Sequence, residues 1–196
     1  LESSMRAYLI AVCLCLASFL LPASLAARQQ DMSKTAFDFH FPSIEGGQLR
    51  LSDYQGKVLL VVNTASQCGF TPQYTALQAI WSEYRDKGLV VIGVPSDDFG
   101  GQELNSEQQV KEFCEVNFDI DFPMTAITKV KGDNAHAFYQ WASQKVGMMG
   151  NPKWNFHKFL IGRDGQMANW FSSMTAPDSQ KMKKSIDAAL AQKIAS

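Results

Sequence analysis

Two continuous apolar runs enclose a segment with helical spacing in the first half of the chain. Residues 58–62 and 89–94 consist of Val, Leu, Ile and one Gly, which is typical of strands buried on both faces of a sheet. Between them, apolar and aromatic residues recur three or four positions apart, from Thr71, the expected N-cap, to Gly88 at the end. Residues 57–95 therefore predict a βαβ unit with parallel strands.

The segments on either side of this unit predict further strands and helices. Phe37, Phe39 and Phe41 alternate with polar residues before a Glu-Gly-Gly turn, which predicts an N-terminal β-hairpin. Capping residues, turns and spacing predict a helix after Ser106 that buries Val110, Phe113, Cys114 and Asn117, a helix over 134–146, strands over 154–161 and 167–173, and a helix from Pro177. This order predicts one α/β domain of thioredoxin-like fold, with a central mixed sheet flanked by helices.

The N-terminal segment has the layout of a secretory signal. A basic residue, an apolar run of about 15 residues and a stretch of small residues follow one another, and the run is shorter than the roughly 20 residues of a membrane span. We expect residues 5–27 to be a signal peptide cleaved near Ala26, with an uncleaved anchor as the alternative, and residues 1–4 to be extraneous sequence. The domain of residues 28–196 would then be exported, periplasmic or secreted, with no stable membrane insertion.

The composition narrows the class of partner. The chain has 196 residues, a formal net charge of −1 and a hydrophobic content of 46%, which is enough to bury a core. This balance of charges gives no positive field for a nucleic acid or an anionic membrane. Of the four cysteines, Cys13 and Cys15 fall in the expected signal, so the mature domain keeps Cys68 and Cys114.

Cys68 lies between the end of a predicted central strand and the start of a predicted helix. Ligand and catalytic sites of open α/β sheets occur at such strand ends. A helix N-terminus stabilises negative charge, so we expect this thiol to ionise more readily than a free one, whose pKa is about 8.5. The alternative is a small buried core cysteine, which the neighbouring Ser, Gln and Gly disfavour.

Several kinds of cysteine chemistry are excluded by what the sequence lacks. Thr71 stands where a disulfide oxidoreductase carries the second cysteine of Cys-x-x-Cys. We expect His40, His136 and His157 to be surface or packing residues, so no Cys–His dyad and no zinc site is indicated. No metal or cofactor is therefore expected.

Three separated blocks carry a resemblance to a known family. Residues 62–71 (VNTASQCGFT), 99–103 (FGGQE) and 153–160 (KWNFHKFL) together resemble the glutathione peroxidase family, of the cysteine rather than the selenocysteine kind. The resemblance runs from about Ala36 to Leu190, which is nearly all of the mature domain.

The resemblance implies four site residues. Cys68 would be the peroxidatic residue, and Gln102, Trp154 and Asn155 would complete the site. An indole N–H and two amides can stabilise a thiolate and the charge that develops on the oxygens of a peroxide, without a strong base.

The second cysteine indicates the subtype. The segment around Cys114 resembles the resolving-cysteine segment of two-cysteine, thioredoxin-dependent members. The alternative is a buried free cysteine on the apolar stripe of its helix. If Cys114 resolves, its helix must loosen, because a disulfide requires Cα atoms within roughly 7 Å of each other.

Some positions depart from the family pattern. Asp97 and Asp98 stand where members commonly have Asn and Gln, and Leu104 replaces a usual proline. The two carboxylates would oppose ionisation of Cys68 if they faced it, and we expect them to point to solvent. About 12 residues separate Trp141 from Trp154, too few for the assembly loop of the tetrameric members, so we expect a monomer with an open site.

These observations give a hypothesis and two alternatives. The chain is expected to be a thiol peroxidase that reduces hydrogen peroxide and organic hydroperoxides through a Cys68 sulfenic acid. Cys114 would resolve it as a disulfide, and a thioredoxin-like protein or glutathione would be the reductant. The alternatives are a peroxide sensor that relays a disulfide to a partner protein, and a non-catalytic binding protein on the same scaffold.

Overall fold

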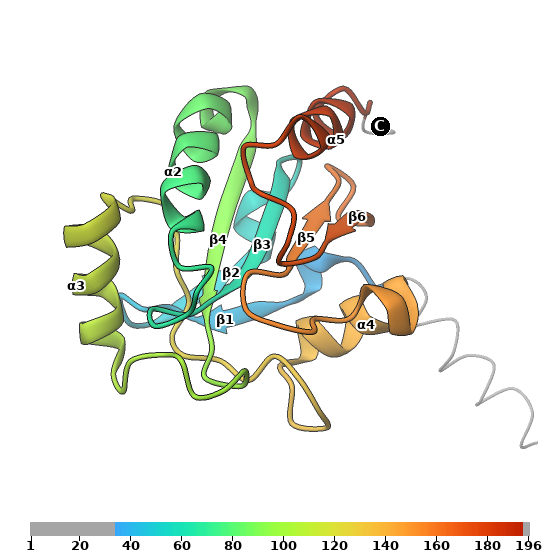
Figure 1. The fold of residues 1–196 in the computed structure, drawn as a ribbon. Coiled ribbons are helices and arrows are strands. Elements are labelled where there is room, and N and C mark those ends of the chain that lie inside the picture. The colour runs from blue at the N-terminus through green and yellow to red at the C-terminus, as the bar shows by residue number, and fades with distance from the viewer. Residues whose placement is uncertain (1–33, 194–196) are drawn as a thin grey trace, which may run out of the picture. The chain divides into compact units, whose positions relative to one another are not determined.

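A four-stranded mixed sheet lies at the centre of the domain, in the order β4-β3-β5-β6 (Figure 1). The computed structural model describes residues 34–193, so the predictions for residues 1–27 and their two cysteines lie outside the described residues. The helices and strands are η1 (Ala36–Asp38), β1 (His40–Pro42), β2 (Gln48–Arg50), η2 (Leu51–Tyr54), β3 (Val58–Thr64), α2 (Gln73–Tyr84), η3 (Arg85–Lys87), β4 (Leu89–Pro95), α3 (Glu107–Phe118), α4 (Ala137–Gly150), β5 (Lys158–Ile161), β6 (Met167–Phe171) and α5 (Gln180–Leu190).

The predicted βαβ unit is confirmed. β3 and β4 pair in parallel from Val58 opposite Leu89 to Thr64 opposite Pro95, and α2 connects them. β5 is antiparallel to β3, and β6 is antiparallel to β5, which makes the sheet mixed as predicted. Gly88 ends the crossover at φ 105°, a left-handed conformation that glycine adopts without a Cβ clash.

Every residue of β3, β4 and β5 is buried because both faces of the sheet are covered. Successive side chains of a strand point to opposite faces, so Val58 and Leu60 enter one core while Leu59 and Val61 enter the other. The first core is completed by α2, α3 and α5, and the second by α4 and the β1-β2 hairpin.

The N-terminal hairpin is confirmed, but it is shorter than the phenylalanine alternation predicted. β1 pairs antiparallel with β2, with Phe41 opposite Leu49. Phe37 lies instead in the 3-10 helix η1, because the Asp38 carboxylate accepts a hydrogen bond from the Thr35 N–H at 2.7 Å and closes a capping box there.

Two helices begin later than predicted, directly after the residues that cap them. The helix predicted from Asn134 begins at Ala137, because the imidazole of His136 accepts the N–H of Phe138 at 3.2 Å. The helix predicted from Pro177 begins after Ser179, whose hydroxyl accepts the N–H of Met182.

The described residues contain no candidate membrane span. Within residues 34–193, none of the helices combines the length and the apolar character that crossing a membrane requires.

Candidate active site

The loop that carries Cys68 leaves the carboxyl end of β3 and leads into α2. Thr71 was predicted as the N-cap of this helix, but its hydroxyl binds within the loop instead: it accepts the N–H of Cys68 at 3.0 Å and donates to the carbonyl of Ala65 at 2.8 Å. The helix begins only after Pro72. Thr71 therefore closes the loop around the cysteine.

The Cys68 side chain is almost enclosed, with 7% of the residue exposed. Its sulfur accepts the backbone N–H of Phe70 at 3.4 Å. An N–H aimed at the sulfur stabilises negative charge there. The thiol is free and lies at the edge of the first core, where a small reagent has limited access.

Gln102 and Asn155 form an amide pair next to this loop. The backbone carbonyl of Gln102 accepts the backbone N–H of Gln67, the residue before Cys68, at 2.9 Å. The Asn155 amide donates to Gln102 Oε1 at 3.0 Å and to the carbonyl of Phe99 at 3.4 Å. Asn155 is completely buried, whereas Gln102 is half-buried. Asn155 therefore holds the Gln102 side chain by its oxygen and leaves the Gln102 NH₂ group free to donate elsewhere.

Trp154 lies at the rim of the same region. The residue is 40% exposed, and its ring packs against Phe99 with ring centroids 6.1 Å apart. An ideal Cβ on Gly100 would contact both Gln102 and Trp154, so these two side chains flank one glycine. The indole thus has an exposed face beside the amide pair.

Asn63 fixes the segment that carries Trp154 and Asn155. Its amide donates to the Trp154 carbonyl at 3.2 Å, and its own carbonyl accepts the N–H of Phe156 at 2.6 Å. Phe156 adopts φ 62°, which is incompatible with an extended strand. The prediction of a strand from Trp154 was therefore wrong, and β5 begins at Lys158.

Cys114 lies on α3, on the side of the helix that faces the first core. It is 1% exposed, and its thiol is free. The pKa of this thiol is raised to about 12, mainly by burial; the hydrogen bond from the Tyr74 hydroxyl opposes the rise, and the charges of Glu103 and Glu115 add to it. Cys114 is therefore a protonated thiol at neutral pH while α3 is in place.

The rest of α3 agrees with its prediction except at one position. Ser106 accepts the N–H of Gln109 at 3.3 Å as the N-cap, and Val110 is buried beside Cys114. Asn117 was predicted to face inward, but it is exposed and its amide donates to the carbonyl of Phe113 one turn back.

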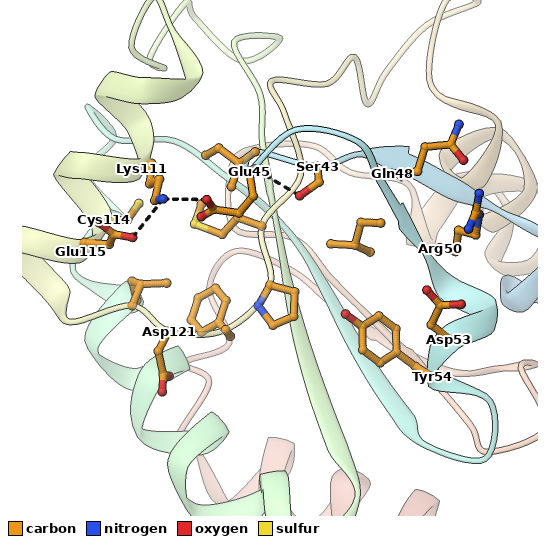
Figure 2. Close-up of a pocket in the computed structure, with 16 residues that line it drawn as sticks. Ser43, Glu45, Gln48, Arg50, Asp53, Tyr54, Lys111, Cys114, Glu115 and Asp121 are labelled. Carbon is orange, nitrogen blue, oxygen red and sulfur yellow. Dashed lines mark hydrogen bonds and ion pairs between the residues drawn. The ribbon is translucent and has the colours of Figure 1, made fainter.

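A pocket of about 400 Å³ lies between α3 and the segment of β2 and η2, and Cys114 lines it (Figure 2). At its α3 end, Lys111 pairs with Glu45 at 2.7 Å and with Glu115 at 3.8 Å. Arg50 and Asp53 lie at the opposite end. Cys68 does not line this pocket, although both cysteines belong to the first core.

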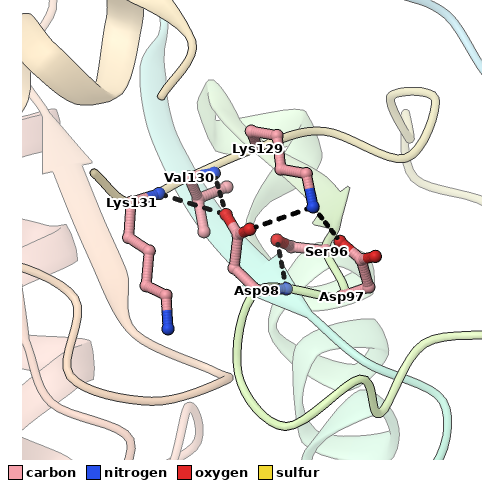
Figure 3. A network of polar contacts seen from close by, with 6 residues as sticks. All are labelled: Ser96, Asp97, Asp98, Lys129, Val130 and Lys131. Atoms are coloured by element: carbon pink, nitrogen blue, oxygen red, sulfur yellow. Dashed lines mark hydrogen bonds and ion pairs between the residues drawn. The ribbon is translucent and has the colours of Figure 1, made fainter. Parts of the chain in front are cut away.

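The two aspartates that depart from the family pattern are engaged by a neighbouring loop (Figure 3). Asp97 pairs with Lys129 at 2.8 Å, and this hydrogen bond lowers the pKa of the carboxyl. Asp98 was expected to point to solvent, but its side chain is 8% exposed and accepts the N–H groups of Val130 at 2.6 Å and Lys131 at 3.2 Å. Both carboxylates are therefore held by the 129–131 segment.

The histidines are surface or packing residues, as predicted. His136 stacks on Phe41, His40 is exposed on β1, and His157 is buried against Phe159 and Trp170. Within residues 34–193, no group of three or more His, Cys, Asp or Glu side chains is arranged to hold a metal ion.

Lys158 is a buried lysine that sequence reasoning missed. Its ammonium donates to Gln73 Oε1 at 2.5 Å and to the Thr175 carbonyl at 2.7 Å, and burial lowers its pKa to about 7. It thereby joins the first turn of α2 to the loop after β6. In the sequence of residues 153–160, Lys158 is a basic residue beside an apolar run, and this pattern does not indicate that its side chain is buried.

Comparisons with known proteins show the family of the chain. The family model described as glutathione peroxidase matches residues 36–143, more than half of the chain. The chain is 41% identical over 151 residues to glutathione peroxidase-like peroxiredoxin 2 of Saccharomyces cerevisiae, covering 76% of this chain and 93% of that protein. It is 39% identical over 154 residues to hydroperoxy fatty acid reductase gpx1 of Synechocystis, covering 74% and 91%.

Solved structures also have the fold of this chain. The crystal structure of Trgpx in its apo form is similar with a TM-score of 0.66 and 37% identity, covering 82% of this chain and 97% of that one. A thioredoxin family protein of Chlorobium tepidum matches with a TM-score of 0.53 at 14% identity, covering 78% and 93%, which confirms the thioredoxin-like fold alone. With its family model, its relatives and its fold in agreement, the chain belongs to the glutathione peroxidase family.

Proposed function

We propose that this peroxidase of the glutathione peroxidase family reduces hydroperoxides at Cys68. The observation that carries the proposal is the placement of the Cys68 sulfur: it accepts the N–H of Phe70, in a loop hydrogen-bonded to the segment that carries Gln102. A thiolate held by neutral donors suits an uncharged substrate such as a peroxide.

The first step is nucleophilic attack on the peroxide. The Cys68 thiolate bonds to one peroxide oxygen, the O–O bond breaks, and the other oxygen leaves as water or an alcohol after taking up a proton. The Gln102 NH₂ and the Trp154 indole N–H are the donors for the departing oxygen. Asn155 acts one step further away, because its amide is committed to Gln102 Oε1 and Phe99.

The second step is resolution by Cys114. Its thiol attacks the sulfur of the Cys68 sulfenic acid, a disulfide forms, and water leaves. The buried Cys114 thiol, with its pKa raised to about 12, is a poor nucleophile in place. Local opening of α3 is therefore part of the proposed cycle, because it would hydrate the thiol and bring it toward Cys68.

The reductant and the substrate are proposed by class. A thioredoxin-like dithiol, or glutathione, reduces the Cys68–Cys114 disulfide and restores both thiols. The similarity to a hydroperoxy fatty acid reductase supports lipid hydroperoxides as substrates beside hydrogen peroxide. If the N-terminal segment directs export, the reductant belongs to that compartment.

Stopped-flow peroxide consumption by three proteins tests the proposal. Wild type turns over with a thioredoxin-type reductant, Cys68→Ser consumes no peroxide, and Cys114→Ser performs one stoichiometric turnover and then stops with that reductant. Undiminished turnover in Cys68→Ser would end the proposal. If Cys114→Ser traps a regulatory protein as a mixed disulfide, and no thioredoxin-like protein, the sensor alternative is favoured.

A further inference from the structure

Glu103 joins the loop that carries Cys68 to the segment that leads into α3. Its side chain is buried, with 6% of the residue exposed, and one oxygen, Oε1, accepts two backbone N–H groups: that of Ser66 at 3.0 Å and that of Leu104 at 2.9 Å. The bond to Ser66 connects positions 37 residues apart in sequence. Hydrogen bonds from N–H groups to a carboxylate are among the stronger ones in proteins.

A second hydrogen bond runs beside this one. Gln67 donates to the Gln102 carbonyl at 2.9 Å, so residues 66 and 67 are bonded to residues 103 and 102 respectively. Cys68 follows directly after residues 66 and 67. On the other side of these bonds, Gln102 carries the side chain that Asn155 orients. These two bonds therefore set where the Cys68 sulfur lies relative to the amide of Gln102.

The other oxygen of Glu103, Oε2, is buried as well. Among the described residues, Glu103 Oε2 has no hydrogen-bond partner. Burial raises the pKa of the Glu103 carboxyl, and its charge in turn raises the pKa of the Cys114 thiol. Glu103 thus contacts the Cys68 loop through one oxygen and acts on Cys114 through its charge.

The chain path connects Glu103 to α3. Leu104, whose N–H it accepts, packs against the first core, and Ser106 caps α3 two residues later. A change at the Ser66–Glu103 bond is therefore transmitted over a few residues to the helix that carries Cys114.

We propose that Glu103 is a positioning residue that latches the Cys68 loop to the segment preceding α3: closed, the latch sets the geometry for peroxide attack, and its release frees Cys114. The inference rests on the proposed function and adds a residue to which the family resemblance assigned no role. It predicts opposite effects on two steps, since weakening the latch slows oxidation of Cys68 and speeds exposure of Cys114.

Two conservative substitutions separate the effect of the length of the Glu103 side chain from the effect of its charge. Glu103→Gln keeps an oxygen at the same distance and loses the charge, whereas Glu103→Asp keeps the charge and is one methylene too short to reach Ser66. We expect Glu103→Asp to slow Cys68 oxidation by hydrogen peroxide about tenfold or more, because small misplacements of reacting groups are costly. We expect Glu103→Gln to stay within about threefold of wild type, because an uncharged acceptor replaces the carboxylate.

The readouts include one that is independent of activity. Hydrogen exchange at the Ser66 amide should be faster in Glu103→Asp than in wild type, and alkylation of Cys114 in a Cys68→Ser background should accelerate with it. Glu112→Gln, an exposed glutamate on α3, is the matched control and should change neither rate. The reverse order of the two variants, or unchanged Ser66 exchange and Cys114 alkylation in Glu103→Asp, would overturn the latch. Turnover in Cys68→Ser would instead count against the proposed function.

Discussion

His157 is a buried imidazole with a large pKa shift. It is 2% exposed, stacks on Trp170 with centroids 5.6 Å apart and meets the edge of Phe159. Its pKa is lowered to about 4, mainly by burial and next by the charge of Lys158, while a hydrogen bond to the Gly150 carbonyl opposes the shift. The native state therefore holds this ring neutral over a pH range in which the unfolded chain protonates it.

This shift predicts an acid-dependent loss of stability. As pH falls from 6.5 to 4, the unfolded chain takes up a proton that the native state refuses, so the free energy of unfolding should fall by up to about 3 kcal/mol. Urea unfolding at pH 7 and pH 4 measures the change in wild type and in His157→Phe. In His157→Phe, the free energy of unfolding should fall less between pH 7 and pH 4 than in wild type. In His40→Phe, which removes an exposed histidine, it should fall as much as in wild type. Equal declines in wild type and His157→Phe would contradict the account.

At the scale of residues, sequence motifs identify candidate site residues but not the long-range hydrogen bonds that hold them. Cys68 and Gln102 were predicted as site residues because their sequence blocks are specific, and the structure places their two segments side by side. Asn63 and Glu103 lie in the same blocks, yet their roles depend on hydrogen bonds across 91 and 37 positions, which only the folded chain specifies. The engagement of Asp98 by the 129–131 segment was missed for the same reason.

At the scale of elements, α3 is the helix on which the proposed cycle depends. Its buried contacts come from Val110 and Cys114, while Val116 is 75% exposed on the other side. Its first turn is held by the Ser106 hydroxyl, which accepts the N–H of Gln109 at 3.3 Å. A helix with few buried side chains and one side-chain cap is suited to local opening.

Removal of this cap should accelerate the labelling of Cys114. Loss of an N-cap destabilises a helix by about 1 kcal/mol, which raises the open population about fivefold. Ser106→Ala, in a Cys68→Ser background, should therefore increase the rate of Cys114 alkylation by that factor. Ser179→Ala removes an equivalent cap from α5, where the hydroxyl accepts the N–H of Met182 at 3.3 Å. It should leave the rate unchanged, and equal acceleration by both variants would mean that Cys114 is exposed by global unfolding instead.

Element types were predicted better than their boundaries. The hydrophobic runs of β3 and β4 follow from burial on both faces, which leaves an unambiguous pattern. The approach to β5 was assigned to a strand because Trp154 and Phe156 are residues typical of strands, but the left-handed Phe156 and its bond to Asn63 keep that segment out of the sheet. Boundaries of this kind depend on tertiary hydrogen bonds, which local propensity does not contain.

At the scale of the whole molecule, the sheet separates two cores, and the proposed chemistry lies at the edge of one of them. Cys68 and Cys114 both belong to the core formed with α2, α3 and α5. The fold class could be predicted from the order of elements, and the family from three separated sequence blocks. The pocket that Cys114 lines and Cys68 does not could not be predicted, because it follows from how α3 packs against its neighbours.

The central claim is that Cys68 is the residue that peroxide oxidises. The most direct measurement treats reduced Cys114→Ser with one equivalent of hydrogen peroxide, traps sulfenic acid with dimedone and maps the adduct by mass spectrometry. The account predicts one adduct, on Cys68, formed as fast as the peroxide disappears. Consumption of the peroxide with Cys68 left unmodified would contradict it.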